Sequence, residues 1–125
     1  QEKAANKQLA NMYLKKAQAA LKGQKYADAY DAALKSNSFV ESGNALYFAG
    51  MSAQKLGQDE KANEAFEQFL VVAPNDKKAD DIRCTLAVSY QKAGNKAKAV
   101  EYYQQILTNP KYTEVAKAQI AALEK

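Results

Sequence analysis

Apolar residues along this chain recur at spacings of three and four residues, the period of one buried face of an α-helix. One such stripe consists of Ala62, Ala65, Phe66, Phe69 and Leu70. The same offsets return 37 residues later (62 to 99), in Ala99, Tyr102, Tyr103, Ile106 and Leu107. A slimmer copy begins at Tyr26. The pattern predicts amphipathic helices whose buried faces repeat along the chain.

Glycine and proline divide this pattern into seven predicted helices, at about residues 3–22, 25–36, 40–56, 59–72, 76–93, 96–108 and 112–124. Gly23, Gly57 and Gly94 each end one apolar stretch and precede another. Glycine in that place is typical of a helix that stops in the left-handed conformation. The short loops that follow predict that pairs of helices fold back into antiparallel hairpins.

Polar residues near the breaks predict where helices begin. The segment from Ser38 to Glu41 has the form of a capping box, which predicts a helix start near residue 40. Pro74 ends the fourth helix, and Asn75 or Asp76 is suited to cap the fifth. These signals divide the hairpins into consecutive units.

Composition supports an all-helical fold. A length of 125 residues is that of one domain, and we expect a single domain over residues 1–125. Alanine occurs 25 times, whereas glycine and proline together occur 7 times. This balance suits closely packed helices and leaves few turn residues for strand hairpins.

The formal net charge of +4 is spread unevenly, as +4 over residues 1–35, −4 over 36–81 and +4 over 82–125. Arg83 is the single arginine, and no basic run exceeds two residues. The chain therefore lacks the clustered basic surface typical of nucleic-acid binding. No stretch approaches the ~20 apolar residues of a membrane span. We expect neither a nucleic-acid partner nor a membrane span.

Candidate chemistry is sparse. The sequence has no His, which excludes imidazole catalysis and zinc sites built on imidazole. Cys84 stands alone and is interpreted as a small apolar residue on a helix. Asp80 and Asp81 are adjacent, so on a helix they point about 100° apart and suit the positive helix end better than a metal. We expect no catalytic residue, no cofactor and no metal.

Three segments resemble the tetratricopeptide repeat family, whose unit of ~34 residues carries small and aromatic residues at fixed offsets before a proline. The best match consists of Leu46, Ala49, Gly50, Ala53, Ala62, Phe66 and Pro74. A second consists of Leu86, Ala87, Tyr90, Ala99, Tyr103 and Pro110. The first segment keeps Tyr13, Ala17, Ala20 and Ala29, but it has Lys16 where the family has an apolar residue.

The resemblance implies an all-α fold, a right-handed superhelical stack of about three helix-turn-helix repeats. Their implied bounds are 9–42, 43–76 and 80–111, with a capping helix at 112–124. The third unit starts three residues late, after an insertion at 75–78, which predicts a changed angle to its neighbour. A simple helical bundle is the structural alternative.

In such a stack the first helix of each pair lines an extended groove that suits a peptide or a helix of another protein. The resemblance implies groove positions at Gln18, Lys22, Asn44, Tyr47, Met51, Gln54, Lys55, Cys84, Val88, Gln91 and Lys92. The three lysines recur just before the glycines. They either attract an acidic peptide or carboxylate, or only suit the negative end of a helix. For Tyr47 and Met51, groove and core are both open.

The leading hypothesis is a non-enzymatic protein–protein interaction module with an unidentified protein or peptide partner. The alternative is a structural or self-assembling scaffold domain of a larger exported protein, which forms homo-oligomers. An enzyme using only Lys, Tyr and carboxylates is a third hypothesis. The chain starts with Gln rather than Met, as after removal of a signal peptide or after cloning. We expect export to the bacterial periplasm, with the cytoplasm as the alternative.

Overall fold

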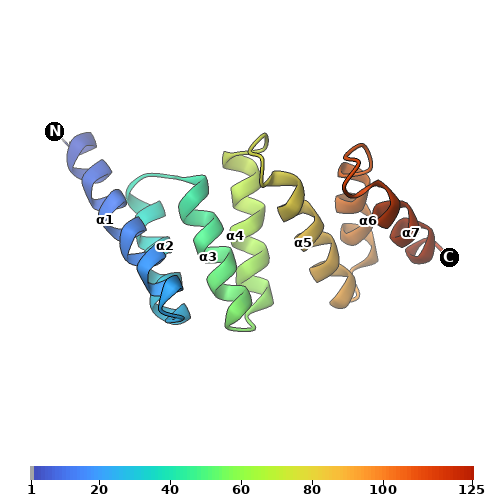
Figure 1. Cartoon of the computed structure of the whole chain (residues 1–125), viewed down its shortest axis with the longest axis horizontal. Coiled ribbons are helices and arrows are strands. Elements are labelled where there is room, and N and C mark those ends of the chain that lie inside the picture. The colour runs from blue at the N-terminus through green and yellow to red at the C-terminus, as the bar shows by residue number, and fades with distance from the viewer. Residues whose placement is uncertain (1) are drawn as a thin grey trace. The chain divides into compact units, whose positions relative to one another are not determined.

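Seven helices make up the part of the chain that the computed structural model describes, residues 2–125. Their bounds are α1 Glu2–Lys22, α2 Tyr26–Phe39, α3 Gly43–Lys55, α4 Asp59–Val72, α5 Ala79–Lys92, α6 Lys96–Gln105 and α7 Thr113–Leu123. No strand occurs in this range. Short turns join α1 to α2, α3 to α4 and α5 to α6 into hairpins (Figure 1). The prediction of an all-helical fold is confirmed.

The helices form two compact units. One contains α1 to α4 and ends at Pro74, and the other contains α5 to α7 and starts at Asn75. In the first unit α1 packs on α2 and α3, α2 also packs on α3, and α3 packs on α4. In the second unit α6 packs on both α5 and α7. The single domain over residues 1–125 and the repeat boundaries remain predictions.

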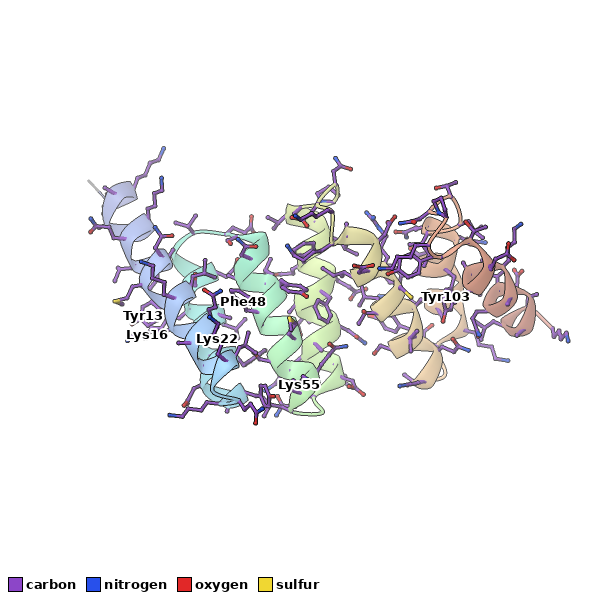
Figure 2. The ribbon with its side chains drawn as sticks, in the orientation of Figure 1. Tyr13, Lys16, Lys22, Phe48, Lys55 and Tyr103 are labelled. Atoms are coloured by element: carbon purple, nitrogen blue, oxygen red, sulfur yellow. The ribbon has the colours of Figure 1, made fainter. Side chains whose placement is uncertain are left out.

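Four alanines form one cluster in the core of the first unit. Ala17, Ala33, Ala49 and Ala65 come from α1, α2, α3 and α4, and they pack into one buried cluster. Phe48 lies against this cluster, and Figure 2 shows it between α1 and α3. Helix axes approach most closely where the residues at the contact are small. One alanine from each helix therefore lets four helices share a single core.

The backbone of α3 lies close to the ring of Phe66, a residue of α4, at Gly50. A Cβ atom at this position would lie 2.6 Å from Cδ1 of Phe66, closer than carbon atoms can pack. Phe66 is 2% exposed and its ring is held by the surrounding core. The absence of a side chain at Gly50 thus lets α3 pack directly on the ring of Phe66, in agreement with the expectation of closely packed helices.

Gly50→Ala should destabilise the protein by about 1–3 kcal/mol. The added methyl overpacks a buried contact, and this cost exceeds the stability gained from the higher helix propensity of alanine. Urea denaturation followed by helical circular dichroism measures this free energy of unfolding. In Gly50→Ala/Phe66→Leu the two losses should be less than additive, because the smaller side chain makes room for the methyl. Full additivity would contradict the contact.

The turn after α3 is a Schellman motif, the double hydrogen bond that ends many helices. The Gly57 amide donates to the Gln54 carbonyl at 2.9 Å, and the Gln58 amide donates to the Ala53 carbonyl at 2.9 Å. Gly57 has a φ of 72°, and Gly94, at the same place after α5, has a φ of 83°. The predicted left-handed glycine stops are confirmed at these two positions.

The turn after α1 has the same two bonds, displaced by one residue from its glycine. The Gln24 amide donates to Leu21 at 3.0 Å, and the Lys25 amide donates to Ala20 at 2.8 Å. Gln24 has the positive φ, 61°, and Gly23 does not. The prediction that Gly23 is the left-handed stop is wrong. The two hydrogen bonds of the motif require the left-handed conformation at the second residue after the helix ends. After α1 that residue is Gln24.

Gln24 is therefore the structural equivalent of Gly57 and Gly94. Ala29 follows Gln24 by five residues, as Ala62 follows Gly57, so the two hairpins share one register. Alignment on backbone conformation instead of on glycine therefore places the first unit in the same register as the other two.

Gln24→Gly should stabilise the protein by up to about 1 kcal/mol, because a left-handed residue with a Cβ costs roughly 1–2 kcal/mol and the greater freedom of unfolded glycine offsets part of the gain. Gly57→Ala should destabilise it by about 1 kcal/mol for the same reason. Gly23→Ala should be near neutral, since its methyl meets the Ala19 carbonyl oxygen at 3.5 Å, an ordinary contact. Thermal denaturation compares the three variants. A loss at Gly23→Ala equal to that at Gly57→Ala would refute the alignment.

The junction between α2 and α3 differs from the prediction. The Ser38 hydroxyl donates to Lys35 at 2.6 Å inside α2, so the expected capping box at 38–41 does not form. Ser42 caps α3 instead, because its Oγ accepts from the Ala45 amide at 3.2 Å. Helix α2 continues to Phe39, whose ring stacks on that of Tyr13 with centroids 5.9 Å apart. This contact with α1 favours the longer helix.

Tyr13 also explains how Lys16 fits a position at which the family has an apolar residue. The Nζ atoms of Lys16 and Lys35 each lie 5.2 Å from the centroid of the Tyr13 ring. Figure 2 shows Tyr13 and Lys16 on the side of α1 that faces away from α3. Cation–π attraction to Tyr13 thus accommodates Lys16 at a position where an apolar residue is usual.

Helix α5 starts later than expected, at Ala79 rather than near residue 76. Asp76 does not cap it. The Asp76 carboxylate accepts from the Lys78 amide at 2.8 Å and its carbonyl accepts from the Ala79 amide at 2.8 Å, which closes a turn ahead of the helix. Asp80 and Asp81 lie in the first turn of α5, as predicted.

The core of the second unit is built around Tyr103. It is 1% exposed and packs with Ala87, Ala99, Ile106 and Ala116. Tyr102, its neighbour, is half-buried and stacks on Tyr90 with centroids 6.1 Å apart. The predicted core position of Tyr103 is confirmed, and it places a phenol group at the centre of this unit.

Candidate functional site

The predicted site residues of the first unit lie on α1 and α3. The exposed ones are Gln18, Lys22, Asn44, Gln54 and Lys55. Tyr47 and Met51 are half-buried. All seven side chains keep some surface open to solvent, but their role in binding remains a prediction.

Tyr47 also packs on the adjacent helix. Its ring centroid lies 6.4 Å from that of Phe66 and 6.3 Å from that of Phe69, both buried residues of α4. Aromatic pairs at such distances contribute about 0.5–1.5 kcal/mol beyond simple burial. Tyr47 therefore helps to hold α3 against α4, and Met51 is the cleaner position at which to test binding.

Lys22, Lys55 and Lys92 are the last residues of α1, α3 and α5. Each stands two residues before the left-handed residue of its turn, so the three positions are equivalent. Figure 2 labels Lys22 and Lys55. All three are exposed, and none pairs with an acidic group of residues 2–125. The helix dipole favours them there, and their ammonium groups remain available to an anion.

An open groove lies within the second unit and has a cavity volume of about 360 Å³. Its lining consists of Val88, Gln91 and Lys92 from α5, Tyr103 from α6, and Val115 and Gln119 from α7. Three of the four residues predicted for this unit therefore lie together in one groove. Cys84, the fourth, packs against the core of the unit.

The walls of this groove are apolar and its floor is polar. Val88 is 37% exposed on one wall and Val115 is 50% exposed on the other. On the floor the Tyr103 hydroxyl donates to Gln91 Oε1 at 2.8 Å, and Gln91 Nε2 donates to Gln119 Oε1 at 2.8 Å. Figure 2 shows Tyr103 between α5 and α7. We name this chain of hydrogen bonds, Tyr103–Gln91–Gln119, the amide relay.

Burial governs the two ionisable groups beside the relay. It raises the pKa of Tyr103, with a further contribution from Cys84, so the phenol keeps its proton and acts as a donor. Burial also raises the pKa of the Cys84 thiol, and the Asp81 charge adds to this while Lys111 opposes it. A thiol that keeps its proton is a poor nucleophile, in agreement with the interpretation of Cys84 as a packing residue.

A second polar cluster, which the sequence did not predict, joins α5 to the turn before α7. Asp81 accepts from the Tyr112 hydroxyl and from Lys111 Nζ, the latter at 3.0 Å. Asp80 accepts from Asn109 Nδ2 at 2.8 Å. We name these contacts the acidic clasp. The acidic clasp connects the turn before α7 to the start of α5. The Gln91–Gln119 hydrogen bond connects α7 itself to α5.

Sequence offered one indirect signal for the clasp. Asp80 and Asp81 open α5, and a donor-rich turn opens α7, but about 30 residues separate the partners. Only the packing of α5 and α7 on α6 brings them together. Gln119 and Val115 were missed for the same reason, since sequence placed them only on a capping helix.

The clasp lowers the pKa of Asp81, mainly through the hydrogen bond from Tyr112 and next through that from Lys111. A carboxyl group with a lowered pKa stabilises the fold above its ordinary pKa of about 3.9, and this contribution is lost as pH falls through the lowered value. Both partners of the Asp81–Lys111 pair are more than half exposed, at 53% and 67%, so water screens it.

Asp81→Asn should therefore lower stability slightly between about pH 5 and pH 8, and the difference should shrink below about pH 4, where the unsubstituted protein also loses the charge. Urea denaturation across this pH range provides the measurement. Lys111→Met removes the same ion pair and should reduce the acid-dependent difference. A difference that persists unchanged in acid would show that the charge of Asp81 is not what stabilises the turn.

Within residues 2–125, no group of three or more Cys, Asp or Glu side chains is arranged to hold a metal ion. None of the helices described above combines the length and apolar character that crossing a membrane requires.

The family model described as tetratricopeptide repeat matches residues 44–76, and it matches again at residues 85–111. The chain is a tetratricopeptide repeat protein. The first match covers α3 and α4, and the second runs from within α5 past the end of α6. No curated protein matches the chain in sequence.

Tetratricopeptide repeats generally mediate protein–protein interaction, and the family is typically non-enzymatic. The hairpin of α1 and α2 lies outside the matched residues, although it ends its first helix with the same Schellman bonds as the matched repeats. The groove of the second unit contains residues of the second matched repeat, Val88, Gln91, Lys92 and Tyr103, together with two residues of α7.

Proposed function

We propose that this tetratricopeptide repeat protein is a non-enzymatic interaction module that binds a peptide or helix of a partner protein in the groove between α5 and α7. The observation that carries the proposal is the combination of two exposed valine walls with a hydrogen-bonded amide floor. Open grooves with apolar walls and a few placed polar groups are typical of ligand sites.

Electrostatics supports a partner with acidic character at this groove. Lys92 lines it and has no acidic partner among the described residues. An exposed ammonium contributes modestly to affinity, but it orients a charged partner and speeds encounter. In the first unit, the proposal extends to the exposed residues Gln18, Lys22, Asn44, Gln54 and Lys55 and to the half-buried Met51.

A second candidate function is self-assembly, as a scaffold domain that docks on another copy. The face of α7 outside the groove supports it, because Ala118 and Ala122 are both exposed there. A second copy of the chain would then be the partner that covers this face.

Val88→Asp should abolish capture of the partner while the fold is kept, because a carboxylate placed on an apolar wall must lose its water when the ligand binds. The measurement is affinity capture from cells of the source organism, with the unsubstituted protein and Val88→Asp immobilised side by side. Gln105→Glu, an exposed change on α6 outside the groove, is the matched charge control.

The same proteins captured by all three forms would refute binding through this groove. An added tagged copy of the chain, recovered by the unsubstituted protein and lost with Val88→Asp, would favour the scaffold function instead. Circular dichroism confirms that each variant keeps its helices.

A further inference from the structure

In the first unit, the second helix of each hairpin is opposite in charge to the first helix. Helices α1 and α3 contain six lysines and one glutamate, a net charge of +5. Helices α2 and α4 contain six acidic residues and two lysines, a net charge of −4. The predicted binding residues of this unit all lie on α1 and α3. The acidic helices α2 and α4 therefore offer a different surface, whose charge attracts a basic partner.

A small cavity opens on this acidic surface, between α2 and α4, and its volume is about 60 Å³. Leu46 and Ala65 are buried and give it an apolar floor, and Leu34 is 39% exposed beside them. At roughly 15 Å³ for each water-sized group, the cavity has room for about four non-hydrogen atoms. It therefore suits the end group of a single side chain. The lining residues are Tyr30 and Leu34 of α2, Leu46 of α3, and Lys61, Glu64, Ala65 and Gln68 of α4.

The rim of the cavity has hydrogen-bond acceptors that the chain itself leaves unused. Glu64 is exposed and forms no ion pair within residues 2–125. The half-buried Tyr30 brings its phenol oxygen to the opposite wall. Burial raises the pKa of Tyr30, and the charges of Glu64 and Asp31 raise it further. Two carboxylates thus make the surroundings of the phenol oxygen negative, which favours a cation there.

One cation of the chain already lies at this cavity. The Nζ atom of Lys61 is 5.6 Å from the centroid of the Tyr30 ring, within the range of a cation–π contact. Lys61 does not pair with Glu64, although the two residues are one helical turn apart on α4. Glu64 is therefore available to a second cation, for which Lys61 is a competitor.

The end groups that fit the volume differ in how well they suit the lining. A leucine side chain would remove water from the Glu64 carboxylate and offer it no hydrogen bond. A lysine ammonium is a strongly hydrated point charge, so it is costly to draw into a narrow cavity. A guanidinium is planar and weakly hydrated, and its several N–H groups serve two acceptors at once. An arginine side chain therefore matches both the apolar floor and the acceptors on the two walls.

We propose that the cavity between α2 and α4 binds an arginine side chain from a basic segment of a partner protein. The guanidinium donates to the Glu64 carboxylate and to the Tyr30 hydroxyl oxygen, and the aliphatic part of the side chain lies on Leu34 and Leu46. The remaining acidic residues of α2 and α4 attract the rest of the basic segment. This surface is separate from the groove between α5 and α7, so a failure of one proposal leaves the other standing.

Three synthetic peptides test the chemistry of the guest. They share the sequence acetyl-Ala-Ala-Xaa-Ala-Ala-amide, in which Xaa is arginine, lysine or citrulline, the uncharged analogue of arginine. In nitrogen-15 NMR titrations of the full chain, the arginine peptide should shift the backbone amide signals of Tyr30, Leu34 and Gln68. The citrulline peptide should bind about tenfold more weakly, because its hydrogen bonds lack the charge. The lysine peptide should bind about threefold more weakly.

Three variants of α4 separate the cavity from the general acidic field. Glu64→Gln should weaken binding of the arginine peptide about fivefold, because it removes the charged acceptor. Glu60→Gln makes the same change at an exposed residue outside the cavity, and it should weaken binding by less than about twofold. Lys61→Gln should strengthen binding about twofold, because it removes the competing cation. Circular dichroism checks that each variant keeps its helices.

Equal affinity for the arginine and citrulline peptides would overturn the proposal, and so would equal losses in Glu64→Gln and Glu60→Gln. Shifts confined to Gln91 and Gln119 would also overturn it, because the arginine would then bind in the groove of the second unit. If the signals of Tyr30 and Leu34 move with protein concentration in the absence of peptide, a second copy of the chain covers the cavity, and the partner assigned to it is wrong.

Discussion

Each hairpin of this chain depends on small side chains along the line where its helices meet. In the first unit, alanines from four helices fill one core, and Gly50 lets the backbone of α3 approach the ring of Phe66. Packing at this density leaves no room for an added methyl. The large aromatic residues can be buried because their partners are small, so the alternation of small and large residues determines how close the helices come.

The same alternation explains how much of the fold could be predicted. Ala62 with Phe66, and Ala99 with Tyr103, carry the buried stripe at fixed helical offsets, which is information local to one helix. This periodicity, divided at glycine and proline, predicted all seven helices. The predictions were wrong where a helix boundary depends on contacts with a neighbouring helix. Ser38 fits a capping box by sequence, but α2 runs past it because Phe39 stacks on Tyr13.

The candidate site shows the same difference between information local to one helix and contacts between helices. Val88, Gln91 and Lys92 were expected in a groove from the resemblance to the repeat family, and they line one groove together. Gln119 could not be predicted, because its partner Gln91 is 28 residues away and the two meet only through the packing of α5 and α7 on α6. Helical periodicity shows which residues share one face of a helix. The width of a groove depends instead on the position of the neighbouring helix.

The amide relay joins the hydrophobic core of the second unit to its surface. Because the Tyr103 hydroxyl donates to Gln91 Oε1, an almost fully buried phenol holds the orientation of an amide group on the floor of the groove. Replacing that phenol with a benzene ring would free both amides to rotate and offer oxygen as readily as nitrogen. The polarity of the groove floor can thus be changed from the interior, with every solvent-facing residue left as it is.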